Sequence, residues 1–430
     1  MFAGALMGGA KDRLLPPSVP YRFFATAVVF HIAGWAALLA DAPSLPGFLG
    51  GLGVGLAGLH LITLGVLAMT AMGAAFQMLP VATRRQLGPV WACRLTWWLF
   101  APGVALLSLG MATGLPAFLH PGATLTVAGF TVFGILVGRN LWSVNDLPGV
   151  TRHGWLALAS LLGLAVLGLA LVVDLSVGFL PDRPLAAAAH AALAGYGFMG
   201  MLVLGFSTVL IPMFVLAPAV PDAAGKRTSA VSVAALVLGG GGALSGQGWA
   251  AALGALAGLV AAGLHIQALR AVLKARMKKT LEPFFRLVRA AWALFPVSLL
   301  LAMALALGAP SEVVAPLWVF VLVFGWLLTF ATGILQRIMP FLASMHSAAH
   351  GGKPALLSKL TAGKPLTVHV AAHGGALALG AIGLVVQSPN LLRAAAAFGL
   401  IGSLAFAAFA IELMRRYRAH KQASPPSPVS

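Results

Sequence analysis

Twelve long apolar segments separated by short polar stretches dominate the sequence. They cover approximately residues 21–40, 49–80, 91–112, 122–142, 154–178, 185–217, 229–247, 249–273, 290–309, 313–342, 366–386 and 392–414. Each segment is long enough to cross a bilayer, because a transmembrane helix needs about 20 mostly apolar residues. The pattern predicts an all-α membrane protein in which residues 21–414 form one twelve-helix domain. A cytoplasmic segment, 1–20, and a disordered basic tail, 415–430, are expected to flank it.

The distribution of charge predicts how the helices are oriented. The chain has 27 Lys and Arg residues against 9 Asp and Glu, a formal net charge of +18 that would suggest nucleic-acid binding in a soluble protein. If the chain starts in the cytoplasm, every Lys and Arg except Arg183 and Arg393 lies on the cytoplasmic side. Cytoplasmic loops of membrane proteins carry such an excess of cations. We therefore expect a multi-pass protein of a bacterial-type inner membrane with both termini in the cytoplasm, the lipid bilayer as partner and no nucleic acid.

The composition excludes several classes of protein. The chain is 60% hydrophobic and only 8% charged, which does not suit a soluble enzyme or a disordered chain. Its one cysteine, Cys93, allows neither an internal disulfide nor a covalent CxxCH haem attachment. No Asp or Glu lies deep within a predicted span, which argues against a proton pump or a proton-driven carrier.

Three of the predicted spans share one pattern of glycine and proline. In each, two glycines eight residues apart are followed seven residues later by a proline. The three sets are Gly65, Gly73 and Pro80; Gly197, Gly205 and Pro212; and Gly325, Gly333 and Pro340. Successive sets lie four spans apart, which predicts three pseudo-repeated four-helix arcs over approximately 21–150, 151–285 and 286–414.

The second span carries a more specific signature. His60 is followed by GAAFQMLP, a polar turn and the aromatic pair in VWACRLTWW. This arrangement, together with twelve spans in three arcs, resembles subunit I of the haem-copper oxidases, the superfamily of cytochrome oxidases and nitric-oxide reductases. The layout from LHIQALRAVL to LQRIMPFLASMHSAAHGGKP is also similar to the NnrS-type haem membrane proteins of the nitric-oxide response. The resemblance implies a b-type haem, a copper site or both.

The sequence departs from the oxidase pattern at the metal ligands. The tenth span, where the resemblance implies haem-ligating histidines, reads APLWVFVLVFGW, and the segment TSAVSVAALVLGG lacks the histidine pair of the copper site. The standard binuclear centre therefore cannot be assembled. We expect a divergent member whose remaining histidines carry the chemistry.

Histidines inside the spans are the candidate site residues, because a buried ionisable group in a membrane is a functional hypothesis by default. His60 and His190 are the expected cofactor ligands, for haem b or for copper. His265, and the i,i+4 pair His369 and His373, are weaker candidates for a metal site. A packed histidine bonded to a backbone carbonyl is the alternative for each. His31 is a further candidate within the first span, whereas His120, His153 and His420 are expected in loops or the tail, solvated.

Two further histidines extend the weaker metal site. His346 and His350 repeat the i,i+4 spacing on the cytoplasmic side of the tenth span, close in sequence to His369 and His373. The four together are a candidate inner metal site, although no acidic or cysteine residue accompanies them.

These observations predict a haem- or copper-binding membrane protein of oxidase subunit I shape that acts in electron transfer or in the handling of haem, copper, oxygen or nitric oxide. A redox protein or a small gaseous ligand is then the expected partner. A cofactor-free permease or assembly factor on the same scaffold is the alternative. Whether the protein is an enzyme is left open, since ligands from unexpected helices would restore activity.

Overall fold

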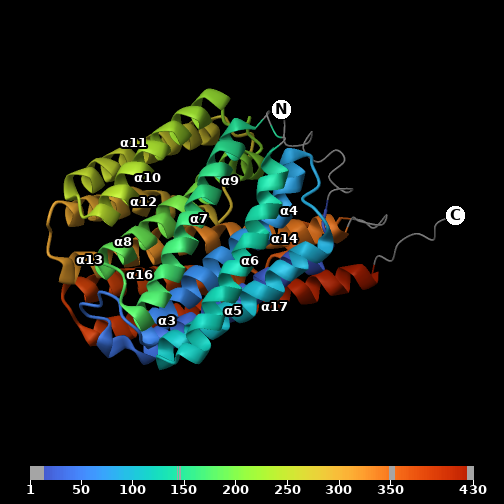
Figure 1. Cartoon of the computed structure of the whole chain (residues 1–430). Coiled ribbons are helices and arrows are strands. Elements are labelled where there is room, and N and C mark those ends of the chain that lie inside the picture. The colour runs from blue at the N-terminus through green and yellow to red at the C-terminus, as the bar shows by residue number, and fades with distance from the viewer. Residues whose placement is uncertain (1–13, 143, 145–146, 348–353, 424–430) are drawn as a thin grey trace.

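The computed structural model describes residues 14–142, 144, 147–347 and 354–423. Within these ranges the chain is helical without strands, and twelve helical segments are long and apolar enough to cross a membrane (Figure 1). The short helices are η2 (Ala42–Ser44) and α15 (Leu357–Leu360). The predicted all-α fold with twelve transmembrane helices is confirmed.

The spanning helices follow one another as up-and-down elements. They are α2 (Ser18–Ala40); α3 (Val54–His60), η3 (Leu61–Ala68) and α4 (Met69–Thr83) in one run; α5 (Val90–Thr113); α6 (Pro116–Trp142); α7 (Pro148–Val177); α8 (Arg183–Ala192), η4 (Leu193–Met199) and α9 (Gly200–Val215) in one run; α10 (Asp222–Ser245); α11 (Gly248–Lys274); α12 (Phe285–Ala306); α13 (Ser311–Phe320), η5 (Val321–Leu328) and α14 (Thr329–Ser347) in one run; α16 (Gly363–Val385); and α17 (Pro389–Ala423).

The last helix is longer than the sequence suggested. α17 continues to Ala423, so residues 415–423, expected to belong to a disordered tail, are helical. Apolar residues such as Leu413 and Tyr417 are buried on its inner face and extend the helix beyond the predicted span. The rest of the expected tail, 424–430, lies outside the described residues. The predicted domain limits and the cytoplasmic position of both termini stay predictions. We use "predicted outer side" for the end of the bundle at the α2–α3, α7–α8 and α10–α11 connections.

The three runs that contain π-helical segments form the centre of the bundle. The π-helical segments η3, η4 and η5 begin at Leu61, Leu193 and Val321. Each start lies 19 residues before the proline of the repeated glycine–proline pattern in the same run. η5 contacts both η3 and η4. The hydrophobic windows of these runs are 56%, 83% and 67% buried, more than those of the other spans. A π-helical turn inside an α-helix marks functional sites more often than chance, and here one occurs at the same depth in every unit.

The repeated glycines explain how each central run packs against the first helix of its own unit. In the first unit, a Cβ on Gly65 or Gly73 would lie 2.7 Å from the Cβ of Phe30 or Phe23 on α2. Glycine therefore lets the two helices approach closely.

The other two units repeat this contact with the same seven-residue step. A Cβ on Gly197 would lie 2.6 Å from the Ser160 Cβ, and one on Gly205 would lie 3.1 Å from the His153 Cβ, both on α7. In the third unit the partners on α12 are Leu294, with its Cδ1 3.3 Å from a Cβ on Gly325, and Leu287, with its Cβ 2.9 Å from a Cβ on Gly333. The three pseudo-repeated arcs are thus a property of the packing as well as of the sequence.

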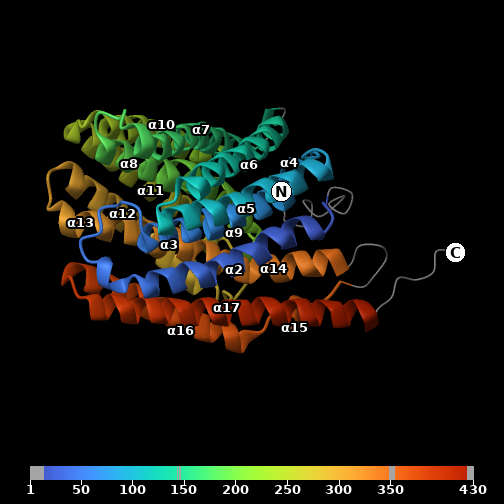
Figure 2. The same ribbon diagram turned by 60° about the horizontal axis from the view of Figure 1, so that its bottom comes forward.

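The ring of units is closed by its first and last helices. In each unit the third and fourth helices pack on each other along their length: α5 on α6, α10 on α11 and α16 on α17. α2 packs against α17, and the two helices lie side by side along one edge of the bundle in Figure 2. Residues of the first span are thereby brought next to residues of the eleventh and twelfth.

Candidate functional site

His60 and His190, the expected cofactor ligands, lie on two central runs. His60 is the last residue of α3, directly before the π-helical segment η3. Its Nδ1 lies 3.0 Å from the Leu56 carbonyl oxygen. A carbonyl only accepts, so Nδ1 donates and the neutral ring keeps its lone pair on Nε2. A backbone carbonyl fixes the tautomer of many metal-bound histidines in the same way.

His190 approaches His60 from α8. The two side chains interact electrostatically, and the buried Nδ1 of His190 has no hydrogen-bond partner. Gly168 on α7 makes room for the ring, because a Cβ there would lie 3.2 Å from His190 Cε1. The structure therefore brings these two residues near each other, and their role as cofactor ligands stays a prediction.

His369 and His373 form a second group, and His31 on α2 joins them. The rings of His369 and His373 stack with centroids 5.7 Å apart and planes at 20°. The His31 ring meets His369 edge-on at 6.4 Å, and Phe406 of α17 lies 5.1 Å from His369. All three histidines are buried, at 2% exposure or less.

The hydrogen bonds of this second group define its tautomers. His369 Nδ1 lies 3.0 Å from the Gly402 carbonyl oxygen and therefore donates to it, while the buried His369 Nε2 has no partner. Thr329 Oγ1 donates its one proton to the Phe324 carbonyl, at 2.9 Å, so it accepts from His373 Nε2, at 2.7 Å. His31 Nε2 accepts from the Trp35 indole at 3.1 Å. Two lone pairs thus remain, on His369 Nε2 and His373 Nδ1.

His265 belongs to neither group but interacts electrostatically with His153. The expectation that His153 is a solvated loop residue is wrong. It lies in the first turns of α7, is fully buried, and its Nδ1 donates to the Gly149 carbonyl at 2.6 Å. Its place seven residues before Ser160, opposite Gly205, explains the burial. The Nε2 atoms of both His153 and His265 are buried without a partner.

The expected four-histidine inner site is not assembled in the described part of the chain. His346 is buried against the Tyr21 ring, with centroids 6.3 Å apart, whereas His369 faces His31. His350 lies outside the described residues. Across those residues, no three His, Cys, Asp or Glu side chains are grouped closely enough to hold a metal ion.

The remaining two histidines are peripheral. His120 is on α6 rather than in a loop, half-buried, with its Nε2 3.2 Å from Ser176 Oγ. His420 is half-buried in the last turns of α17. Neither is close to the buried groups by any contact seen in the described chain.

A large cavity lies elsewhere in the second unit. It has a volume of about 390 Å³ and is enclosed by α8, η4, α10, α11 and α12, with Trp318 of α13 at its side. A second, much smaller cavity of about 20 Å³ lies between α4, α6, α7 and α9. Neither is lined by a histidine.

The buried histidines can be compared with the ligands that haem and copper require. The donor chemistry fits, because imidazoles with one nitrogen fixed on a carbonyl and the other free suit both iron and copper. Neither of the two cavities described has His60 or His369 in its wall, so neither is a preformed porphyrin pocket for these histidines. The residues thus fit a metal held by imidazoles more closely than they fit a preformed haem pocket.

The comparisons with known proteins agree with the fold. No family model matches the sequence, and no curated protein matches it. Among solved structures, the chain is similar to a haem-copper terminal oxidase that was determined as a dimer by cryo-electron microscopy. The TM-score is 0.61 at 15% identity, over 97% of this chain and 85% of that one. At this identity the likeness is one of fold, so the chain shares the helical arrangement of that oxidase. The NnrS-type resemblance stays a prediction.

Sequence reasoning missed several parts of these groups. Thr329 and Gly402 hold the tautomers of His373 and His369, yet both come from other helices. His31 and Trp35 have the i,i+4 spacing of a hydrogen-bonded pair on one helix face, which was a usable signal. The apolar run that marks the fifth span begins after His153, so the sequence predicts a loop at this residue. The helix α7 in fact begins earlier, at Pro148.

Proposed function

We propose that the protein binds a metal cofactor, haem b or copper, through histidines buried in its membrane domain. On this proposal it acts in electron transfer or in the handling of haem, copper, oxygen or nitric oxide, with a redox protein or a small gas as partner. The observation that carries the proposal is the set of buried imidazole nitrogens without hydrogen-bond partners on His153, His190, His265, His346 and His369. Burying such an atom costs free energy unless something satisfies it, and a metal ion does so.

Each histidine group has a different part in the proposal. His60 and His190 are the ligands for a cofactor on the central runs, with His60 Nε2 as the axial ligand if that cofactor is haem b. His369 and His373 offer Nε2 and Nδ1 to a copper ion, with Gly402 and Thr329 as the groups that orient them. His265, with His153, is the remaining candidate. When bound, iron or copper would supply one-electron chemistry and a binding position for a small ligand.

The chain's own residues would set the environment of that metal. The carbonyls of Leu56 and Gly402 keep the Nδ1 protons in place, so that Nε2 of His60 and His369 stays available. The packed rings of Trp35 and Phe406 exclude water from the group around His31. A hydrophobic shell of this kind would limit the access of water to the metal and lower the local dielectric constant, while the hydrogen bonds to the carbonyls keep the ligands oriented.

A second function is favoured by a separate observation. The large cavity described is mostly apolar and has no histidine in its wall, as in a scaffold that has lost its cofactor. A cofactor-free permease or assembly factor would have this character. Metal analysis and the visible spectrum of the purified protein separate the two. Iron or copper bound in proportion to protein, and lost with His60→Ala or His369→Ala, supports the first function, and a colourless, metal-free protein supports the second.

A further inference from the structure

The large cavity of the second unit is elongated along the helices. Its lining includes Gly246, Gly248 and Gly308 at the predicted outer end and reaches Ser232 and Ala261 deeper in the bundle. On α11 alone the lining extends from Gly248 to Ala261, which at 1.5 Å per residue is about 20 Å. Gly246 and Gly308 are exposed whereas Ser232 and Ala261 are buried. The cavity thus opens at the predicted outer end and closes towards the middle of the membrane.

The other two units carry larger side chains in the corresponding region. In the first unit, aromatic rings fill the region between the third and fourth helices: Phe100 and Phe130 lie 4.6 Å apart, and Phe130 and Phe198 lie 5.4 Å apart. In the third unit, His369 and Phe406 occupy it. In the second unit, α10 and α11 present glycine and alanine instead. The scaffold therefore does not impose the cavity, and the residues of this unit create it.

The polar side chains in the cavity wall, those of Tyr196, Ser232 and Trp318, all make hydrogen bonds. The Trp318 indole donates to Tyr196 Oη at 3.0 Å, Tyr196 donates to Ser298 Oγ at 3.1 Å, and Ser232 Oγ donates to the Thr228 carbonyl at 2.9 Å. The rest of the wall is apolar. Water is held in buried cavities by two to four polar partners, which this wall does not offer.

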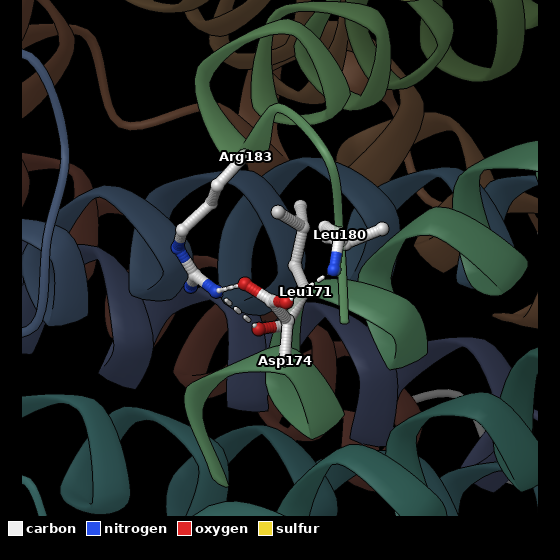
Figure 3. A network of polar contacts seen from close by, with 4 residues as sticks. All are labelled: Leu171, Asp174, Leu180 and Arg183. Carbon is white, nitrogen blue, oxygen red and sulfur yellow. Dashed lines mark hydrogen bonds and ion pairs between the residues drawn. The ribbon is translucent and has the colours of Figure 1, made fainter. Parts of the chain in front are cut away.

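A group of polar contacts fixes the turn between α7 and α8, next to the start of the cavity wall. Arg183 Nη1 lies 2.9 Å from Asp174 Oδ2 and also donates to the Leu171 carbonyl, and the Leu180 backbone N–H donates to Asp174 Oδ1 at 2.7 Å (Figure 3). Leu185, two residues after Arg183, is part of the cavity wall. The turn thus fixes the point from which α8 enters the cavity wall.

We propose that this cavity binds one long hydrocarbon chain of a membrane lipid, inserted from the predicted outer side with its head group at the mouth. The occupant follows from the surroundings, because the cavity is apolar and elongated, lies within the membrane domain and opens at the predicted outer end, where lipid hydrocarbon chains are the matching neighbours. Filling it removes the destabilisation that an empty cavity causes in proportion to its volume. A phospholipid acyl chain and an isoprenoid quinone tail share this chemistry, and their masses distinguish them.

The test measures lipid retained by the full-length protein. The protein is purified in mild detergent and exchanged into a delipidating detergent, and the retained lipid is then extracted, identified and quantified per protein by mass spectrometry. Gly240→Leu fills the cavity, since a Cβ at Gly240 would lie 3.6 Å from Leu193 Cδ2, an ordinary contact. Gly241→Leu is the matched control, because Gly241 is exposed and has nothing within 4 Å of its Cβ position.

The proposal expects one species of long-chain lipid to be retained by the wild-type protein and by Gly241→Leu, and lost from Gly240→Leu. The filled variant should also keep a higher unfolding temperature than the wild type after delipidation. Ala302→Leu, at another lining position, repeats the test if Gly240→Leu does not elute as a single species. Equal retention in all variants, no retained lipid in the wild type, or a porphyrin displaced by Gly240→Leu would each overturn the proposal.

Discussion

His369 and His373 stack one helical turn apart, at 5.7 Å, and leave opposite ring nitrogens free. The Gly402 carbonyl accepts a hydrogen bond from His369 Nδ1, and the Thr329 hydroxyl accepts one from His373 Nε2. The two rings come from one helix, but their tautomers are set by two others, α17 and α14. This relationship makes the group sensitive to changes at residues that are not histidines.

Replacing Thr329 by valine should destabilise the protein. The change keeps the shape of the side chain but removes the acceptor for His373 Nε2, and an unsatisfied buried donor costs about 1–3 kcal/mol. Unfolding in mixed detergent micelles measures the loss of free energy. Thr367→Val is the control, because its exposed hydroxyl only bonds back to the Gly363 carbonyl, and the expected change is within about 0.5 kcal/mol. Equal effects of both substitutions would contradict the assigned hydrogen bond.

Replacing glycine by alanine should have opposite effects on stability at a repeated glycine, Gly73, and at a glycine with open space around it, Gly374. Gly73→Ala should destabilise by about 1–3 kcal/mol, because its Cβ would lie 2.7 Å from the Phe23 Cβ and force α2 and α4 apart. Gly374→Ala in α16 has nothing within 4 Å and should stabilise by up to about 1 kcal/mol through helix propensity. Thermal unfolding of both variants in detergent compares them. A Gly73→Ala protein as stable as the wild type would show that the close helix contact is absent.

Two cations expected on the outer side should differ in their contribution to stability. Arg183→Ala breaks the ion pair with Asp174 and removes a hydrogen bond to the Leu171 carbonyl, so it should lower the unfolding temperature. Arg393 is exposed near the start of α17, and Arg393→Ala should change stability by less than about 0.5 kcal/mol. High salt should reduce the difference in stability between the two variants, because Arg183 is 38% exposed and salt screens its ion pair. A difference that salt leaves unchanged would argue against an ion-pair origin.

Much of the fold could be predicted because hydrophobic length and glycine spacing are local signals. The twelve spans and the shared register of Gly73, Gly205 and Gly333 are visible in the sequence, and the structure adds only what each glycine contacts. The end of α17 was predicted too early, because its charged last turns have the composition of a solvated tail, although residues such as Tyr417 are buried.

The candidate site was less predictable because it depends on contacts between distant helices. His60 and His190 are visible in the sequence as single candidates, but their proximity is not, and His31 reaches His369 only because α2 packs against α17. The separation of His265 from His369 and His373 likewise follows from the order of the units. The cavity arises from glycines and alanines that in sequence predict only close packing, which α10 and α11 do show.

The most direct test of metal binding combines the reduced-minus-oxidised visible spectrum with iron and copper analysis of the purified protein. Our account predicts bound iron with a b-type absorbance band, or bound copper, in a fixed ratio to protein. The signal should be lost in His60→Ala or His369→Ala and kept in His120→Ala, which alters a histidine at the edge of the bundle. A folded wild-type protein without iron, copper or visible absorbance would contradict the account and favour a cofactor-free permease or assembly factor.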